Sequence, residues 1–156
     1  MEKEEKYRLL LAQVTSLVEG EDDEVSVMAN VSAAIHETMG FFWTGFYVVK
    51  PVKTDGDGKE ELRLGPFQGP VACMHIGYGR GVCGTAWQRA ETVVVPDVEA
   101  FPGHIACSSL SRSEIVVPVF DARHRVKAVL DIDSKELGTF DEVDARWLEQ
   151  IVGVLA

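Results

Sequence analysis

Two apolar segments near the end of the sequence, separated by a short polar turn, place the strongest constraint on the fold. Residues 115–120 and 126–132 are rich in valine and isoleucine, and five residues connect them. So short a connection joins antiparallel strands, whereas a parallel crossover needs a dozen residues or more. The sequence therefore predicts an antiparallel hairpin in this part of the chain.

Four more segments have the composition of strands. Residues 41–49, 62–64, 71–76 and 92–96 are rich in β-branched or aromatic side chains. Two Asp-Gly pairs within residues 53–60 supply a turn signal between the first two of these segments. Strands and helices do not alternate regularly along the chain, so we expect an antiparallel sheet of about six strands.

Amphipathic segments predict helices at both ends of the chain. Residues 3–19 and 24–39 each carry an apolar stripe at helical spacing and are followed by a glycine, and a further helix begins near Asp141. A shorter helix is expected at residues 82–89. We therefore expect a single α+β domain over residues 1–156, with the N- and C-terminal helices packed on one face of the central sheet.

The charge and hydropathy of the chain exclude several classes of partner. The formal net charge is -10, whereas nucleic acids and anionic membrane surfaces attract positively charged proteins. No apolar run approaches the roughly 18–20 residues of a membrane span, and residues 1–6 are charged rather than apolar as in a secretory signal. We therefore expect a cytoplasmic protein that binds neither nucleic acid nor membrane.

The sequence contains three cysteines, and an odd number in a reducing compartment argues against a structural disulfide framework. Cys83 begins the predicted short helix, where backbone N–H groups can lower the pKa of a thiol. Cys107 lies in a long loop, with His104 and Arg112 near it in sequence, and long loops in compact domains are usually functional. Cys73 falls in a predicted strand, which favours a core thiol over a reactive one.

Acidic side chains are predicted beside that loop. Asp131 and Asp133 alternate with Leu130 and Ile132, so the two acids share one face of their strand. Buried acids on a mostly apolar strand are costly unless they are paired, hydrogen-bonded or protonated, and a solvated sheet face is the alternative interpretation. Glu114 opens the neighbouring strand, so we expect the three acids to converge.

A metal site is a competing interpretation of the same part of the sequence. The spacing of the possible ligands lacks the C-x₂₋₄-C pair that is typical of structural zinc. We therefore do not expect a structural zinc site. The thiolate and imidazole ligands considered for zinc are Cys73, His75, Cys83, His104 and Cys107.

Several segments, spread over essentially the whole chain, together resemble the free methionine-(R)-sulfoxide reductases, which are enzymes with a GAF fold. The segment WTGFY at 43–47 is similar to the first strand of that family. The other matching segments are LGPFQG at 64–69, GRGVCGTA at 79–86, GHIAC at 103–107, SEIVVP at 113–118 and VLDIDS at 129–134.

The resemblance implies a reductase for the R epimer of free methionine sulfoxide that uses thiols without a metal or cofactor. Cys107 matches the family cysteine that attacks the sulfoxide. Cys83 and Cys73 match the two that resolve or relay the disulfide, and the order in which they act stays open. The family's active-site acids match Glu114, Asp131 and Asp133.

Elementary chemistry supports this interpretation. Attack on a sulfoxide leaves an oxygen that needs a proton, so a neutral carboxylic acid is required, and the substrate ammonium group needs a carboxylate. A second cysteine condenses with the sulfenic acid, and a thioredoxin-like dithiol then reduces the disulfide. A homodimer is left open. The methylthio group needs an apolar wall, for which the candidates are Trp43, Phe46, Tyr47 and Phe67.

Two alternatives lack turnover: a GAF sensory module that binds a small ligand, and a thiol redox switch that has no substrate. Three thiols together with three inward-facing acids exceed what ligand binding needs, which favours the enzyme. Formation of methionine from the racemic free sulfoxide with dithiothreitol separates the three hypotheses.

Overall fold

The computed structural model describes residues 1–53, 58–104 and 109–156. These residues form helices and a β-sheet. Its six-stranded sheet has the order β3-β2-β1-β6-β5-β4, and each neighbouring pair is antiparallel. The predicted α+β class and the predicted hairpin, which is β5 and β6, are confirmed. The strands are β1 (Trp43–Pro51), β2 (Glu60–Gln68), β3 (His75–Gly77), β4 (Val93–Val95), β5 (Ser113–Phe120) and β6 (Val126–Ser134).

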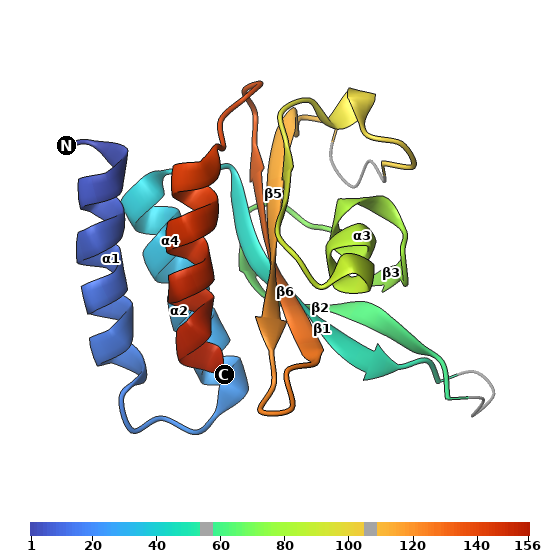
Figure 1. Ribbon diagram of the computed structural model, residues 1–156, viewed down its shortest axis with the longest axis horizontal. Helices are drawn as coiled ribbons and strands as arrows, with labels where there is room; N and C mark the ends of the chain where they lie inside the picture. The colour runs from blue at the N-terminus through green and yellow to red at the C-terminus, as the bar shows by residue number, and fades with distance from the viewer. Residues whose placement is uncertain (54–57, 105–108) are drawn as a thin grey trace.

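The helices lie on the two faces of the sheet in unequal numbers. Helices α1 (Lys3–Val18), α2 (Glu24–Met39) and α4 (Glu142–Val152) form a layer on one face, as predicted, while α3 (Gly81–Arg89) lies on the other face (Figure 1). Short 3₁₀ turns occur at Val98–Ala100 and Gly153–Leu155. Within the described ranges, no helix has both the length and the apolar character that a membrane span requires.

The two faces of the sheet belong to two apolar clusters. Leu130 and Ile132 of β6 pack with the three-helix layer, whereas Val129 packs on the opposite face with Trp43 and α3. This alternation follows from the pleat of the strand, in which successive side chains point to opposite faces. The α3 face of the sheet also carries the acidic residues of β5 and β6.

The segment before β3 differs from its prediction. The expected strand over residues 71–76 is reduced to the three residues of β3, and β2 extends well beyond the expected 62–64 because it pairs with β1 as far as Thr44 and Gln68. Cys73 consequently lies in a loop rather than in a strand. The Tyr47 hydroxyl donates a hydrogen bond of 2.9 Å to the Cys73 carbonyl, so a side chain satisfies this backbone group in place of a sheet ladder. Part of the predicted turn at 53–60 lies outside the described residues.

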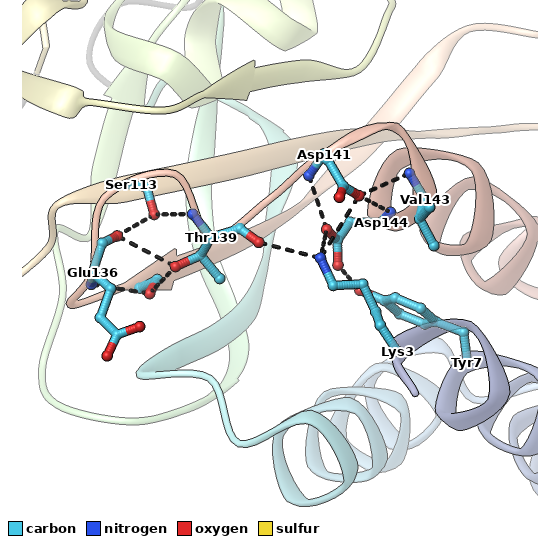
Figure 2. Close-up of polar contacts among 9 residues, drawn as sticks. Lys3, Tyr7, Ser113, Glu136, Thr139, Asp141, Val143 and Asp144 are labelled. Atoms are coloured by element: carbon cyan, nitrogen blue, oxygen red, sulfur yellow. Dashed lines mark hydrogen bonds and ion pairs between the residues drawn. The ribbon is translucent and has the colours of Figure 1, made fainter. Parts of the chain in front are cut away.

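A polar network ties the start of α4 to α1 (Figure 2). Asp144 is fully buried, accepts a hydrogen bond from the Tyr7 hydroxyl, and pairs with the Lys3 ammonium group at 2.7 Å. The Asp141 carboxylate accepts hydrogen bonds from the Val143 and Asp144 N–H groups, and the Asp144 carboxylate accepts one from the Asp141 N–H, which completes a capping box. These contacts fix both helices against each other.

A second group in the same view holds the start of β5. The Ser113 hydroxyl donates to the Glu136 carbonyl and accepts from the Thr139 N–H, while the Ser134 and Thr139 hydroxyls lie 2.6 Å apart (Figure 2). The Ser113 side chain is thus bound to the turn that follows β6. These hydrogen bonds fix the backbone next to Glu114, whose side chain faces the opposite side of the sheet.

Candidate active site

A pocket lies on the α3 face of the sheet and holds about 580 Å³ of space, its open mouth included. Its walls come from β1, β5, β6, the start of α3 and the segments on either side of them. The residues that line it are Phe42, Trp43, Tyr47, Pro70, Val71, Ala72, Ile76, Arg80, Gly81, Val82, Cys83, His104, Ser111, Glu114, Asp131 and Asp133.

The three predicted acids converge in this pocket. Glu114 pairs with Asp133 across the β5–β6 ladder, and Asp131 lies two residues further along the same face of β6. Glu114 and Asp131 are buried, and Asp133 is partly buried, so the alternative of a fully solvated sheet face is wrong. The period-two pattern of the sequence predicted this convergence.

The pKa values of the acids reflect their burial and their mutual repulsion. Loss of solvent raises the pKa of Glu114 well above its ordinary value, and the neighbouring charges of Asp131 and Asp133 raise it further. Loss of solvent, followed by the charge of Asp131, also raises the pKa of Asp133 well above its ordinary value. Burial raises the pKa of Asp131 as well, but its hydrogen bonds with Glu114 and Cys83 oppose the rise. The cluster therefore retains protons at a pH at which isolated carboxylates have lost them.

Asp131 also has an open acceptor. Its side chain is 6% exposed, and its Oδ1 atom is buried without a hydrogen-bond partner in the part of the chain that the structure describes. A buried acceptor without a donor costs free energy. The atom lies in a residue that lines the pocket, so a ligand with a positive charge or N–H groups can satisfy it.

Cys83 lies on α3 and faces the acids rather than the solvent. It is buried, it is a free thiol, and its side chain hydrogen-bonds with Asp131. Burial raises the pKa of this thiol well above its ordinary value, and the charges of Asp131, Glu114 and Asp133 raise it further. The expectation that the start of the helix lowers this pKa is therefore wrong, because desolvation and three carboxyl groups outweigh the helix terminus.

An aromatic wall closes one side of the pocket. The Trp43 ring stacks on Tyr47, with ring centres 6.0 Å apart, and on Phe67, with ring centres 5.2 Å apart. Trp43 and Tyr47 line the pocket, whereas Phe67 supports Trp43 from behind. Gly45 lies between Trp43 and Tyr47 in β1. A Cβ atom at this position would come within 2.3 Å of the Phe67 Cβ, so the stacking needs glycine. Phe46 packs in the opposite cluster, so its prediction as a wall residue is wrong: its odd offset from Trp43 turns it to the helical layer.

Of the other two cysteines, Cys73 lies next to the pocket and Cys107 is not among the described residues. Cys73 is half-buried, is disulfide-bonded, and follows the pocket residue Ala72. Its carbonyl group is held by Tyr47 from the pocket wall. Cys107, the predicted attacker, lies outside the described residues, so its role remains a prediction.

Some pocket residues were not identified as site residues from the sequence. His104 lines the pocket and its Nε2 atom lies 4.0 Å from Glu114 Oε1, while loss of solvent lowers its pKa against the opposing charges of Asp131 and Glu99. Arg80 and the N-terminal residues of α3 also contribute, and the glycine-rich run before the helix was the signal for them. Arg112, which was considered as a neighbour of Cys107, is exposed and is not part of the pocket lining.

Glycine residues at the start of α3 allow backbone segments to lie close together. Gly79 and Gly81 have φ angles of +73° and +61°, and a Cβ atom on Gly84 would lie 2.6 Å from the Gly77 carbonyl oxygen. The helix begins without a side-chain cap, and its first residues, Gly81, Val82 and Cys83, line the pocket. A tight turn thus presents the N-terminus of α3 to the pocket.

Comparison with known proteins gives results that agree with this geometry. A model of the GAF domain matches residues 21–156. The chain is 53% identical to "GAF domain-containing protein A" of Dictyostelium discoideum, over 98% of this chain and 92% of that protein. It is 40% identical to the "Free methionine-R-sulfoxide reductase" of Escherichia coli, over 99% of this chain and 89% of that protein.

A solved structure is similar along nearly the whole chain. The free methionine-R-sulfoxide reductase of Neisseria meningitidis in complex with its substrate superimposes with a TM-score of 0.91 and is 50% identical, covering 99% of this chain and 89% of that chain. Identity at this level over this length exceeds what a shared fold alone produces. The chain therefore belongs to the GAF domain family and, within it, to the free methionine-R-sulfoxide reductases, which are oxidoreductases.

Proposed function

We propose that this protein reduces free methionine-(R)-sulfoxide to methionine. The observation that carries the proposal is the pocket in which Glu114, Asp131 and Asp133 meet below an aromatic wall. The relative from Neisseria meningitidis binds its substrate on the same fold, and it is half identical to this chain. A pocket with this composition suits a small zwitterion that has an apolar tail.

The substrate's three parts find matching groups in the pocket. Its ammonium group lies against Asp131, whose Oδ1 atom has no partner among the described residues. Its carboxylate lies at the uncapped N-terminus of α3, close to Arg80, where the helix dipole and backbone N–H groups favour an anion. Its methyl group packs on Trp43 and Tyr47. Capture of both the amino and the carboxylate group excludes a residue within a peptide.

Glu114 is the proposed proton donor for the sulfoxide oxygen. Burial and the charges of Asp131 and Asp133 raise its pKa and favour the neutral form, which is the form that a general acid requires. Asp133, which pairs with it across the ladder, helps to keep that proton in the cluster. The remaining charge on the acids then balances the substrate ammonium group.

The reducing electrons come from cysteine thiols. We assign the attack to Cys107: its thiolate bonds to the sulfoxide sulfur, and the oxygen ends on a cysteine sulfenic acid while methionine leaves. A second thiol condenses with the sulfenic acid and releases water, so two thiols and a sulfoxide give a disulfide, a thioether and water. Cys73 is the proposed second thiol, which is supported by its disulfide-bonded state and by the free state of Cys83.

Cys83 is less suited to nucleophilic attack. A thiol whose pKa is raised by burial and by three acids is mostly protonated, and the thiolate is the nucleophile. We propose that a thioredoxin-type dithiol reduces the Cys73 disulfide by exchange, because Cys73 lies in a loop beside the exposed side chains of Val71 and Met74. Such recycling requires a reducing compartment such as the cytoplasm.

Turnover of a racemic mixture tests the function. The purified protein, racemic free methionine sulfoxide and excess dithiothreitol are incubated, and methionine and both epimers are separated on a chiral column. We expect conversion to stop at about half of the total sulfoxide, with the S epimer left, because the pocket is chiral. Consumption of both epimers, comparable turnover of an N-acetylated methionine sulfoxide amide, or no methionine at all contradicts the proposal.

A further inference from the structure

Three ligand atoms of a type that binds transition metals meet at the floor of the pocket. One sulfur of Cys83 and one carboxylate oxygen each of Glu114 and Asp131 all lie within 4.8 Å of one another. The three residues come from α3, β5 and β6, so the rigid sheet and the helix packed on it hold them together. Each of the three is buried.

This set differs from the zinc site considered from the sequence. The zinc ligands considered from the sequence were Cys73, His75, Cys83, His104 and Cys107, without any acid, and the lack of a C-x₂₋₄-C pair argues against a structural zinc site. The cluster in the pocket instead combines one cysteine with two acids from different strands. No local spacing rule detects such a combination, because the ligands are brought together by the fold.

A separate observation indicates that the cluster is open to a ligand. Asp131 is more than nine-tenths buried, lines the pocket, and leaves Oδ1 without a hydrogen-bond partner in the part of the chain that the structure describes. By contrast, the buried carboxylate of Asp144 is held by a phenol, an ammonium group and a backbone N–H. The Asp131 side chain, which contributes one oxygen to the cluster, thus keeps an acceptor atom that no described group uses.

The chemistry of the three ligands selects a class of cation. A thiolate disfavours the hard cations Mg²⁺ and Ca²⁺, whereas sulfur, carboxylate and imidazole together suit Zn²⁺ and its analogues Co²⁺ and Cd²⁺. The Nε2 atom of His104 lies 4.0 Å from Glu114 Oε1, outside the set of three, so a water molecule is the expected fourth ligand. Ligands that carry up to three negative charges compensate the desolvation of a divalent cation.

We propose that the reduced protein binds a zinc-class divalent cation through Cys83, Glu114 and Asp131, and that this cation inhibits the enzyme by occupying its substrate pocket. The binding part stands on the cluster alone. The inhibition part rests on the proposed function, because the cation takes the same acids that receive the substrate ammonium group. Such a site gives Cys83 a role that does not require it to attack the sulfoxide.

Cobalt titration of a variant with a single thiol tests the binding. In the double variant Cys73→Ser/Cys107→Ser, Cys83 is the one remaining cysteine of the sequence. Adding Co²⁺ should produce a near-ultraviolet thiolate-to-cobalt absorption band that saturates at one equivalent, and Zn²⁺ should displace it. Adding Asp131→Asn or Glu114→Gln to this background should weaken Co²⁺ binding at least about tenfold, which is the loss that even changes next to metal ligands cause.

His75→Gln is the matched control. This histidine pairs with Glu61 in an exposed cluster away from the acids, and its replacement should leave the cobalt titration unchanged. Absence of the absorption band in the double variant, or a band that persists unchanged in both acid variants, overturns the proposed site. Circular dichroism of each acid variant confirms that it is folded, and the two variants provide independent tests.

Inhibition is measured on the wild-type chain. With a phosphine reductant that does not chelate the metal, Zn²⁺ should raise KM for the sulfoxide and leave kcat near its starting value, and free methionine should displace Co²⁺ from the double variant. Cobalt binding without any turnover would refute the proposed function but keep the metal site. Turnover that is insensitive to Zn²⁺, or cobalt binding that methionine does not affect, refutes the inhibition.

Discussion

Asp144 and Asp131 are both buried aspartates, yet one lies in the helical layer and the other lies on the opposite face of the sheet. Asp144 is surrounded by donors: the Tyr7 hydroxyl, the Lys3 ammonium group and the Asp141 N–H (Figure 2). Its negative charge is compensated, and its position fixes α1 against α4. Nothing in this arrangement is left for a ligand.

Asp131 is compensated only in part: its hydrogen bonds with Glu114 and Cys83 and the charge of His104 do not cancel the effect of burial, and its pKa stays raised. Its neighbours include Glu114, Asp133 and the Cys83 thiol, and its Oδ1 atom has no hydrogen-bond partner within the described ranges. This arrangement lowers the stability of the folded state, and a bound cation offsets that loss. The comparison teaches that burial alone does not identify a functional acid, whereas burial without a complete set of donors does.

The largest expected effect separates the two aspartates by activity. Asp131→Asn should lower kcat/KM for free methionine sulfoxide at least about 10²-fold, the usual loss for a positioned acid or charge partner. Asp133→Asn and Glu114→Gln should behave in the same way, whereas Asp144→Asn should leave kcat/KM near the wild-type value. Steady-state assays below the melting temperature of each variant measure this. Full activity in all three pocket variants would remove the acids from the mechanism.

The next effect separates the aspartates by stability. Asp144→Asn should lower the free energy of unfolding by about 2–3 kcal/mol, because it removes charge-assisted hydrogen bonds from a fully buried group. Urea denaturation measures the change. The exposed residue Asp22 provides the control, since Asp22→Asn should change the free energy by no more than about 0.5 kcal/mol. Equal effects of the two substitutions would show that the Asp144 network adds no stability.

The pocket acids should have the opposite effect on stability. Folding raises the pKa of Glu114, so the folded state keeps a proton that the unfolded state loses above about pH 4. Wild-type stability should therefore fall as the pH rises from that point through the raised pKa. Glu114→Gln removes the Glu114 contribution to this dependence, while Asp131 and Asp133 keep theirs, so the variant should lose less stability than the wild type between pH 5 and pH 8. Parallel pH profiles of the two proteins from pH 5 to pH 8 would contradict this assignment.

The smallest effect concerns the cation that compensates Asp144. The Lys3 side chain is 35% exposed, so solvent screens its pairing with Asp144. Lys3→Met should lower the free energy of unfolding by about 0.5–1 kcal/mol at low salt and by less at high salt. Urea denaturation at two salt concentrations measures this. A loss as large as that of Asp144→Asn would mean that the ammonium group alone stabilises the buried carboxylate.

Local pattern predicted most of the fold and the acid cluster. Two strands joined by five residues had to form a hairpin, and the alternation of Asp131 and Asp133 with apolar neighbours placed both acids on one face. The same rule, applied to β1, assigns Trp43 and Tyr47 to the pocket and Phe46 to the helical layer. Phe46 was therefore assigned wrongly because it was chosen for its aromatic side chain and not for its position in the period-two pattern of the strand.

What the pattern left open depended on contacts between distant segments. The length of β2 was set by its pairing with β1, and the Cys73 carbonyl accepts its hydrogen bond from Tyr47, a residue distant in the sequence. Cys83 meets the acids because α3 packs on β5 and β6, and His104 lines the same pocket. The sign of the Cys83 pKa shift followed from this burial, which a local helix rule does not include.

The most direct test of thiol-based reduction is a single turnover without added reductant. The fully reduced wild-type chain is mixed with excess free methionine-(R)-sulfoxide, quenched in acid, and analysed for methionine, free thiols and disulfide-linked peptides. We predict one methionine per chain, the loss of two thiols, a Cys73–Cys107 linked peptide, and Cys83 recovered as a free thiol. Three free thiols and no methionine after mixing would contradict the account.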